Sequence, residues 1–196
     1  MNPEVKKKFL RYKICVSGAA VTDLCPKNAL AMAEELGKQI VYYNGVVITG
    51  ATTGMPYWAA KGAKEAGGIS IGFSPAASEI EHVKKYRLPT DYYDVIVYTG
   101  FNYAGRNLLL TRAADAVIVT CGRMGTLNEF TIAFEDEKPI GVLDLKGKDG
   151  TVELIREIVK TAHRGPGKIV YGSDPRTLVE QVLELIDKEK AVRINH

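Results

Sequence analysis

Residues 115–129 read D-A-V-I-V-T-C-G-R-M-G-T-L-N-E, and this stretch combines a strand, a tight turn and the start of a helix. The apolar run 116–119 is rich in β-branched residues, which is typical of a strand buried on both faces. Gly122 and Gly125 allow the backbone to bend sharply or to approach a ligand closely. Leu127, Phe130 and Phe134 then recur at helical spacing. The segment therefore predicts a strand that runs through a glycine turn into a helix beginning at Thr126.

Strand and helix patterns alternate along the rest of the chain. Strands are predicted at 12–16, 46–49, 69–73, 94–98, 116–119, 140–145 and 169–171, and helices at 26–43, 56–66, 152–162 and 174–188, with two more carrying Arg106 and Thr126. Such alternation implies right-handed crossovers between parallel strands. We therefore predict an α/β fold: a Rossmann-like, doubly wound and mostly parallel sheet of about seven strands, with helices on both faces, in one domain over residues 1–196.

The composition excludes several classes of protein. A formal charge of +3 is too small, and the basic residues too scattered, for a nucleic-acid-binding protein. The basic run Lys6-Lys7-Lys8 is interpreted as a solvated tail. No apolar run approaches the roughly 20 residues of a membrane span, and the charged N-terminus lacks a signal-peptide core. We therefore predict a cytoplasmic protein without nucleic-acid or membrane partners.

The cysteines and histidines show no catalytic or metal-binding pattern. Cys15, Cys25 and Cys121 are odd in number and have no C-x-x-C spacing, which favours reduced thiols over a disulfide or a zinc site. The histidines at positions 82, 163 and 196 lie in polar surroundings or at the terminus and are expected to be exposed. The motifs G-x-G-x-x-G, Walker A and G-x-S-x-G are all missing from the sequence. A site in this protein would use carboxylate and guanidinium groups, with no metal and no required cofactor.

Glycine turns follow three of the predicted strands. Ligands of parallel α/β sheets bind beyond the carboxyl ends of the strands, and a helix that begins there offers unpaired N–H groups to an anion. Three such turns favour a nucleotide-like ligand that carries a phosphate. The candidate binding residues in or near these turns are Gly18, Gly50, Thr52, Thr53, Gly54, Gly122, Arg123, Met124, Gly125 and Thr126.

Glu129 has two interpretations that its spacing cannot separate. It follows Thr126 by three residues, so the pair can form a capping box in which Glu129 bonds the backbone N–H of Thr126. Alternatively, the carboxylate points at a ligand held by the same turn. The helix dipole is then expected to favour its ionised form, which makes it a base or a hydrogen-bond acceptor.

The residues from Arg106 to Glu129 resemble the LONELY GUY family, formerly labelled lysine decarboxylases. Its motifs are an Arg-Lys pair and P-G-G-x-G-T-x-x-E, which here read Arg106-Asn107 and C-G-R-M-G-T-L-N-E. The resemblance is strongest over residues 12–145. It implies a Rossmann-like protein, a homodimer or higher homo-oligomer, that cleaves nucleoside 5′-monophosphates into free base and ribose 5-phosphate. It also implies that Glu129 and Arg106 are catalytic and that the glycine turn holds the phosphate.

The sequence departs from the family motif at three positions. Cys121 replaces a proline, Arg123 replaces a glycine and Asn107 replaces a lysine. An Arg-Asn pair resembles the related molybdenum-cofactor carrier proteins, which bind a phosphorylated pterin without chemistry. A carrier for a nucleotide or a phosphorylated pterin is therefore the alternative to the hydrolase, and a ligand sensor that works through oligomerisation is a third. For Arg106 itself, a surface ion pair competes with a phosphate contact, and Arg112 is expected to pair with Asp115 or another acid.

Overall fold

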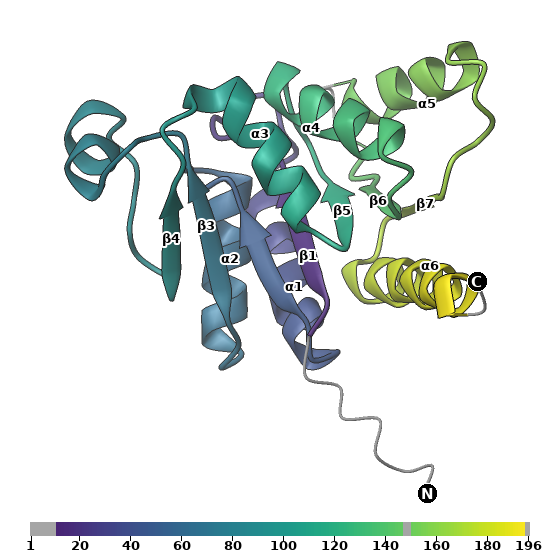
Figure 1. The fold of residues 1–196 in the computed structure, drawn as a ribbon, viewed down its shortest axis with the longest axis horizontal. Coiled ribbons are helices and arrows are strands. Elements are labelled where there is room, and N and C mark those ends of the chain that lie inside the picture. The colour runs from purple at the N-terminus through teal and green to yellow at the C-terminus, as the bar shows by residue number, and fades with distance from the viewer. Residues whose placement is uncertain (1–10, 147–149, 195–196) are drawn as a thin grey trace, which may run out of the picture.

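Seven parallel strands form one sheet at the centre of the molecule (Figure 1). A computed structural model describes residues 11–146 and 150–194. The strand order is β4-β3-β2-β1-β5-β6-β7, and every neighbouring pair is parallel. The predicted seven-stranded Rossmann-like sheet is confirmed, with a wholly parallel arrangement. The strands are β1 (Lys13–Ser17), β2 (Val46–Thr49), β3 (Ser70–Ser74), β4 (Val95–Tyr98), β5 (Ala116–Val119), β6 (Ile140–Leu143) and β7 (Ile169–Gly172).

Helices cover both faces of the sheet. Helices α1, α2 and α6 contribute to the core on one face, and α3, α4 and α5 to the core on the other, as Figure 1 shows. This division confirms the doubly wound arrangement. The helices are α1 (Ala29–Tyr42), α2 (Met55–Glu65), α3 (Asn102–Ala113), α4 (Met124–Glu135), α5 (Thr151–Thr161) and α6 (Pro175–Ile194), and a π-helical turn, η1 (Glu81–Lys85), precedes β4.

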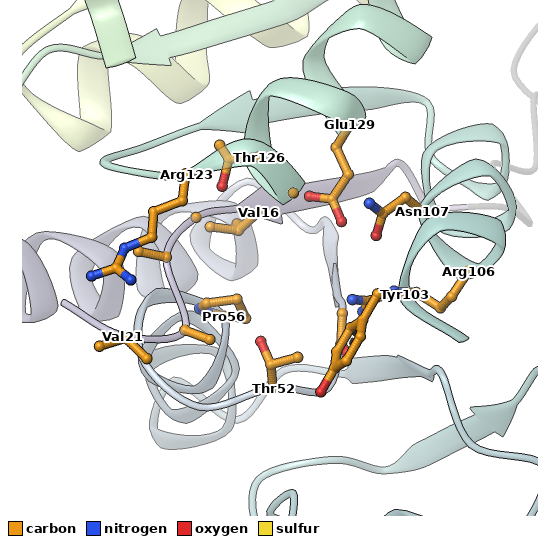
Figure 2. Close-up of a pocket in the computed structure, with 15 residues that line it drawn as sticks. Val16, Val21, Thr52, Pro56, Tyr103, Arg106, Asn107, Arg123, Thr126 and Glu129 are labelled. Carbon is orange, nitrogen blue, oxygen red and sulfur yellow. Dashed lines mark hydrogen bonds between the residues drawn. The ribbon is translucent and has the colours of Figure 1, made fainter. Parts of the chain in front are cut away.

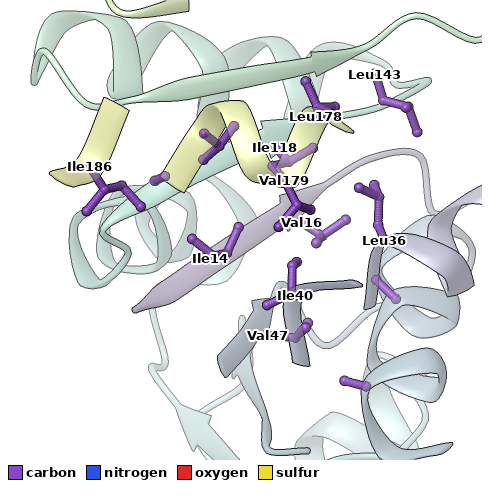
Figure 3. Packing of buried hydrophobic residues seen from close by; sticks show 14 residues of the cluster. Ile14, Val16, Leu36, Ile40, Val47, Ile118, Leu143, Leu178, Val179 and Ile186 are labelled. Atoms are coloured by element: carbon purple, nitrogen blue, oxygen red, sulfur yellow. The ribbon is translucent and has the colours of Figure 1, made fainter. Parts of the chain in front are cut away.

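The apolar runs of the central strands are explained by burial on both faces. Ile14 and Val16 of β1 pack with Leu36 of α1 and Leu178 of α6 (Figure 3), whereas Cys15 between them joins the opposite core. Successive residues of a strand point to opposite faces, so a strand covered on both sides has no polar position. This is why 116–119 and 140–143 are entirely buried.

The order of the strands creates a topological switch point between β1 and β5. The chain builds the sheet outward from β1 to β4, then returns to place β5 on the other side of β1. The loops that follow β1 and β5 are therefore neighbours, and the Ala19 N–H donates to the Cys121 carbonyl at 2.9 Å. Crevices at such switch points are the usual ligand sites of parallel α/β folds.

The switch point also overturns the prediction of reduced thiols. Cys25 and Cys121 form a disulfide with a Cα–Cα distance of 5.8 Å, across 96 residues of sequence, while Cys15 is free and buried. The prediction relied on the spacing of the cysteines along the chain, and this spacing contains no information that the loops after β1 and β5 lie next to each other in the fold.

Several local predictions also need correction. His82 is buried rather than exposed, and its ring nitrogens contact Ser74 Oγ at 2.8 Å and the Pro89 carbonyl at 2.9 Å. Helix α1 begins at Ala29 rather than at residue 26, and α6 continues to Ile194. The 6–8 basic run lies outside the described residues. Within the described ranges, no helix is long and apolar enough to cross a membrane.

Ion pairs near the ends of α3 follow the sequence analysis only in part. Arg112 pairs with Asp136, with 3.0 Å between Nε and the carboxylate, so the partner is another acid rather than Asp115. Asp115 instead accepts from the Lys13 ammonium at 2.8 Å and from the Lys13 N–H. Arg112 is thereby used on the surface, away from the glycine turns.

Glycines bring α1 and α2 to backbone contact. A Cβ on Gly37 would lie 2.0 Å from the Ala59 carbonyl oxygen, so Gly37→Ala must push the helices apart. Alanine normally stabilises a helix relative to glycine by about 1 kcal/mol. Here we expect the free energy of unfolding to fall by about 3 kcal/mol because of overpacking, measured by urea denaturation. Gly125→Ala in α4, where a Cβ meets no atom within 4 Å, is the control and should show no loss; equal stability of the two variants would contradict the prediction.

Candidate functional site

A pocket of about 320 Å³ lies at the carboxyl ends of β1, β2 and β5 (Figure 2). The loops after β1 and β2, helix α3 and the start of α4 all contribute to its wall. The lining residues are Val16, Gly18, Ala19, Ala20, Val21, Gly50, Thr52, Pro56, Tyr103, Arg106, Asn107, Arg123, Gly125, Thr126 and Glu129. The pocket thus occupies the switch-point crevice.

Most of the candidate residues meet in this pocket. Arg106 and Glu129 line it together, although they lie on different helices. The other candidates that line it are Gly18, Gly50, Thr52, Asn107, Arg123, Gly125 and Thr126. These residues come from four segments of the chain, so only the folded sheet brings them together.

Four candidates do not line the pocket. Thr53 donates its hydroxyl to the Ala20 carbonyl at 3.0 Å, and Met124 is 78% exposed. Gly54 has a φ of +69°, and a Cβ there would lie 2.2 Å from the Ala19 carbonyl oxygen. Gly122 donates its N–H to the Thr151 hydroxyl at 3.1 Å. Thr53, Gly54 and Gly122 therefore shape the loops around the pocket rather than its surface.

Sequence reasoning missed the aromatic wall and one polar neighbour of Glu129. Tyr103 lines the pocket and is 48% exposed. It precedes Arg106 by three residues, and residues three apart share one face of a helix. Its position relative to Arg106 could therefore have predicted that it faces the pocket. Ser17, the last residue of β1, donates its hydroxyl to the Glu129 carboxylate.

The capping-box interpretation of Glu129 is wrong. Helix α4 begins at Met124 with Arg123 as its N-cap residue, and no side chain of the described chain caps it. Thr126 is therefore the third residue of the helix rather than its cap. The helix begins two residues earlier than predicted, because the chain enters it directly from the extended backbone of Arg123. Glu129 is free to face the pocket, as Figure 2 shows.

The surroundings of Glu129 shift its pKa in the opposite direction to the prediction. The side chain is only 7% exposed, and burial raises its pKa, against smaller lowering effects of Arg106 and of the Ser17 hydrogen bond. The helix dipole acts mainly within the first turn, and Glu129 lies beyond it. Burial therefore outweighs the dipole, and the neutral carboxyl, which can donate a hydrogen bond, is favoured relative to an exposed glutamate.

Arg106 is a buried residue rather than half of a surface ion pair. It is 4% exposed, and its guanidinium donates to the carbonyls of Gly50 and, at 3.0 Å, Phe73. Its Nε has no hydrogen-bond partner among the described residues. Arg106 therefore ties the ends of β2 and β3 to α3 and places a positive charge in the pocket wall beside Glu129.

The start of α4 is the part of the pocket best suited to an anion. The first N–H groups of a helix have no partner within it and carry a partial positive charge. Gly125 exposes its backbone to open space, because an added Cβ would meet no atom within 4 Å. Arg123 stands at the same end and pairs with Asp23 at 2.5 Å, with both side chains exposed. Backbone donors and one guanidinium thus converge on a single part of the pocket.

The raised pKa of Glu129 predicts a pH effect on stability. An acid whose folded pKa exceeds its unfolded value, about 4.5 here, binds more protons in the native state than in the unfolded state. The free energy of unfolding therefore declines as the pH rises from the unfolded pKa through the folded pKa. Glu129→Gln should remove this decline and make the protein more stable than the wild type at neutral pH. Urea denaturation between pH 4 and 8 measures it. Glu184→Gln, at an exposed position of α6, is the control; parallel pH profiles for wild type and Glu129→Gln would contradict the prediction.

Two of the solved structures that share this fold are named for binding or carrying the molybdenum cofactor. The molybdenum cofactor carrier protein of Chlamydomonas reinhardtii is 27% identical, with a TM-score of 0.72 over 91% of this chain and 99% of that one. The molybdenum cofactor binding protein of Rippkaea orientalis is 27% identical, with a TM-score of 0.70 over 92% and 98%.

More distant proteins share the fold alone. DNA processing protein A of Streptococcus pneumoniae is 21% identical, with a TM-score of 0.62 over 89% of this chain and 61% of that one. At this identity the likeness concerns architecture, and the absence of a nucleic-acid partner stays a prediction.

The sequence model of the SLOG cluster4 family matches residues 11–179, which include the whole of the switch-point pocket. The chain therefore belongs to the SLOG cluster4 family.

Proposed function

We propose that this protein is a binding or carrier protein for a small phosphorylated heterocycle, of which the molybdenum cofactor is the leading candidate. The observation that carries the proposal is the uncapped start of α4, which opens into the pocket at Gly125. A phosphate there would accept from backbone N–H groups, as at other helix N-termini. The likeness to two proteins named for molybdenum-cofactor carriage or binding supports the choice of ligand.

The opposite part of the pocket suits a flat ring system. Tyr103 offers an aromatic face next to Arg106, whose guanidinium carbon lies 5.9 Å from the ring centroid. Aromatic faces stack on planar heterocycles with little dependence on their identity. The polar groups of the lining are hydroxyl, amide, carboxyl and guanidinium groups. Recognition would therefore go through the phosphate and the ring edge.

The burial of Glu129 favours binding over hydrolysis, because it disfavours the ionised carboxylate. Cleavage of an N-glycosidic bond builds positive charge on the ribose, which an ionised carboxylate stabilises. Burial raises the pKa of Glu129, and a neutral carboxyl offers a hydrogen bond instead of that charge. Arg106, the other expected catalytic group, already donates to two backbone carbonyls.

A phosphoribohydrolase is the second candidate. It is favoured by one observation: Glu129 and Arg106 line the same pocket, as the resemblance to the LONELY GUY family implies.

Assembly into a homodimer or higher homo-oligomer is part of the same proposal and is supported by exposed apolar residues at α3, namely Phe101, Leu108 and Leu109.

The two candidates differ in what happens to a bound nucleotide. We expect a phosphorylated pterin to raise the melting temperature, its dephosphorylated form to have little effect, and AMP to remain intact in a chromatographic assay. Glu129→Gln should retain binding, since glutamine keeps an acceptor for Ser17 and a donor for the ligand. Release of free adenine by the wild type but not by Glu129→Gln would establish the hydrolase instead. Failure of every phosphorylated compound to bind would remove both candidates.

A further inference from the structure

We propose that the Cys25–Cys121 disulfide is a reducible clasp that holds residues 21–28 at the rim of the pocket, and that reduction by a dithiol opens it. The inference concerns regulation of the pocket described above. Segment 18–28 joins β1 to α1 and contributes Gly18, Ala19, Ala20 and Val21 to the lining. The disulfide attaches the far half of this segment, residues 21–28, to the turn that leads into α4.

Among the described residues, only the first half of segment 18–28, residues 18–20, is held by hydrogen bonds between its backbone and neighbouring elements. The Ala19 N–H donates to Cys121, the Met55 N–H donates to the Ala19 carbonyl, and the Thr53 hydroxyl donates to the Ala20 carbonyl, all at 2.9–3.0 Å. Beyond Ala20, the backbone bonds recorded for the described residues are local, such as that from the Cys25 N–H to the Thr22 carbonyl. The near half is therefore a fixed part of the fold, whereas the far half is held in place by contacts of its side chains.

In the described part of the chain, the far half is joined to the α4 turn by two side-chain links. They are the disulfide and the ion pair between Asp23 and Arg123. Both ionic side chains are exposed, and exposed ion pairs contribute little to stability. Val21 and Leu24 are exposed as well and add little packing. The covalent link is therefore the main restraint on this part of the pocket rim, where Figure 2 places Val21 and Arg123.

The disulfide is positioned for exchange with a thiol. Cys25 is partly exposed, whereas Cys121 is buried, so an incoming thiolate would attack the Cys25 sulfur. The Cys25–Cys121 bond breaks, Cys121 leaves as a thiolate and takes a proton, and the second thiol of the reagent resolves the mixed disulfide. The reagent is oxidised to a disulfide by two electrons and the protein gains two thiols. Cys15 is fully buried on β1 and takes no part.

Thiol titration and limited proteolysis test the clasp without any ligand. The oxidised full-length protein, denatured without reductant, should show one thiol, from Cys15, and three after dithiothreitol. Lys27 is exposed within the segment, and trypsin should cleave after it at least about 10-fold faster in the reduced protein. The Cys25→Ser variant should be cleaved at the fast rate with or without reductant, and Cys15→Ser should behave as wild type. Three thiols before reduction, or equal cleavage in both states, would overturn the proposal.

Ligand release separates this inference from the proposed function. With a phosphorylated pterin as probe, reduction should raise the dissociation rate at least about 10-fold in the wild type and leave Cys25→Ser unchanged. If the probe binds neither form while cleavage at Lys27 still responds to reduction, the clasp stands and the proposed ligand falls. If the probe binds both forms with one dissociation rate, the clasp does not control the pocket.

Discussion

Gly125→Asp is expected to weaken binding of a phosphorylated ligand at least about 100-fold while the fold stays intact. A Cβ at this position would meet no atom within 4 Å, and Gly125 lines the α4 end of the pocket. A carboxylate about 5 Å from a phosphate charge, at an effective dielectric constant of about 20, costs about 3 kcal/mol, which corresponds to about 100-fold in affinity.

Stability should change in the opposite direction to affinity. An aspartate in the first turn of a helix interacts favourably with the helix dipole, by about 0.5 kcal/mol. Calorimetric titration with a phosphorylated pterin and urea denaturation of the same samples measure the two effects. Gly125→Asn has nearly the same size without the charge, so it separates repulsion from steric exclusion. Equal affinities of the Asp and Asn variants would show that no anion occupies this end of the pocket.

Arg106→Met is expected to lower the free energy of unfolding by about 3–5 kcal/mol. The methionine fills much of the same volume but leaves the carbonyls of Gly50 and Phe73 without their donor. A buried acceptor without a partner costs about 1–3 kcal/mol, and hydrogen bonds from charged donors are stronger than neutral ones. Loss of the positive charge also removes an influence that lowers the pKa of Glu129, so Glu129 should hold its proton more strongly.

The matched control for Arg106 lies on the same helix. Arg112 is exposed and pairs with Asp136 on the surface, so Arg112→Met should change stability by no more than about 1 kcal/mol. The double variant Arg106→Met/Glu129→Gln should lose less than Arg106→Met alone, because glutamine does not require a neighbouring cation. Urea denaturation of the four proteins measures these differences. Similar losses for Arg106→Met and Arg112→Met would mean that the buried hydrogen bonds contribute little.

Part of the pocket wall is visible in the sequence, because tight turns at the ends of strands leave a local signature. Glycines after consecutive strands marked the turns at the carboxyl edge of the sheet, and Gly18, Gly50 and Gly125 do line the pocket. Glycines alone could not separate a turn that faces a ligand from one that packs against the protein. Gly54 and Gly122 belong to the second kind, since neither lines the pocket.

The alternation of apolar strands and amphipathic helices was enough to determine the class of fold. A strand buried on both faces is a short continuous apolar run, whereas a helix buried on one face repeats its apolar residues every three or four positions. The tertiary structure alone decided the order of the strands, and with it the meeting of the β1 and β5 loops. That meeting pairs Cys25 with Cys121, and it buries Glu129 beside Ser17 with its pKa raised. These outcomes depend on contacts between residues about a hundred positions apart and on the exclusion of water. Neither leaves a pattern in neighbouring residues, so no reading of local sequence could have supplied them.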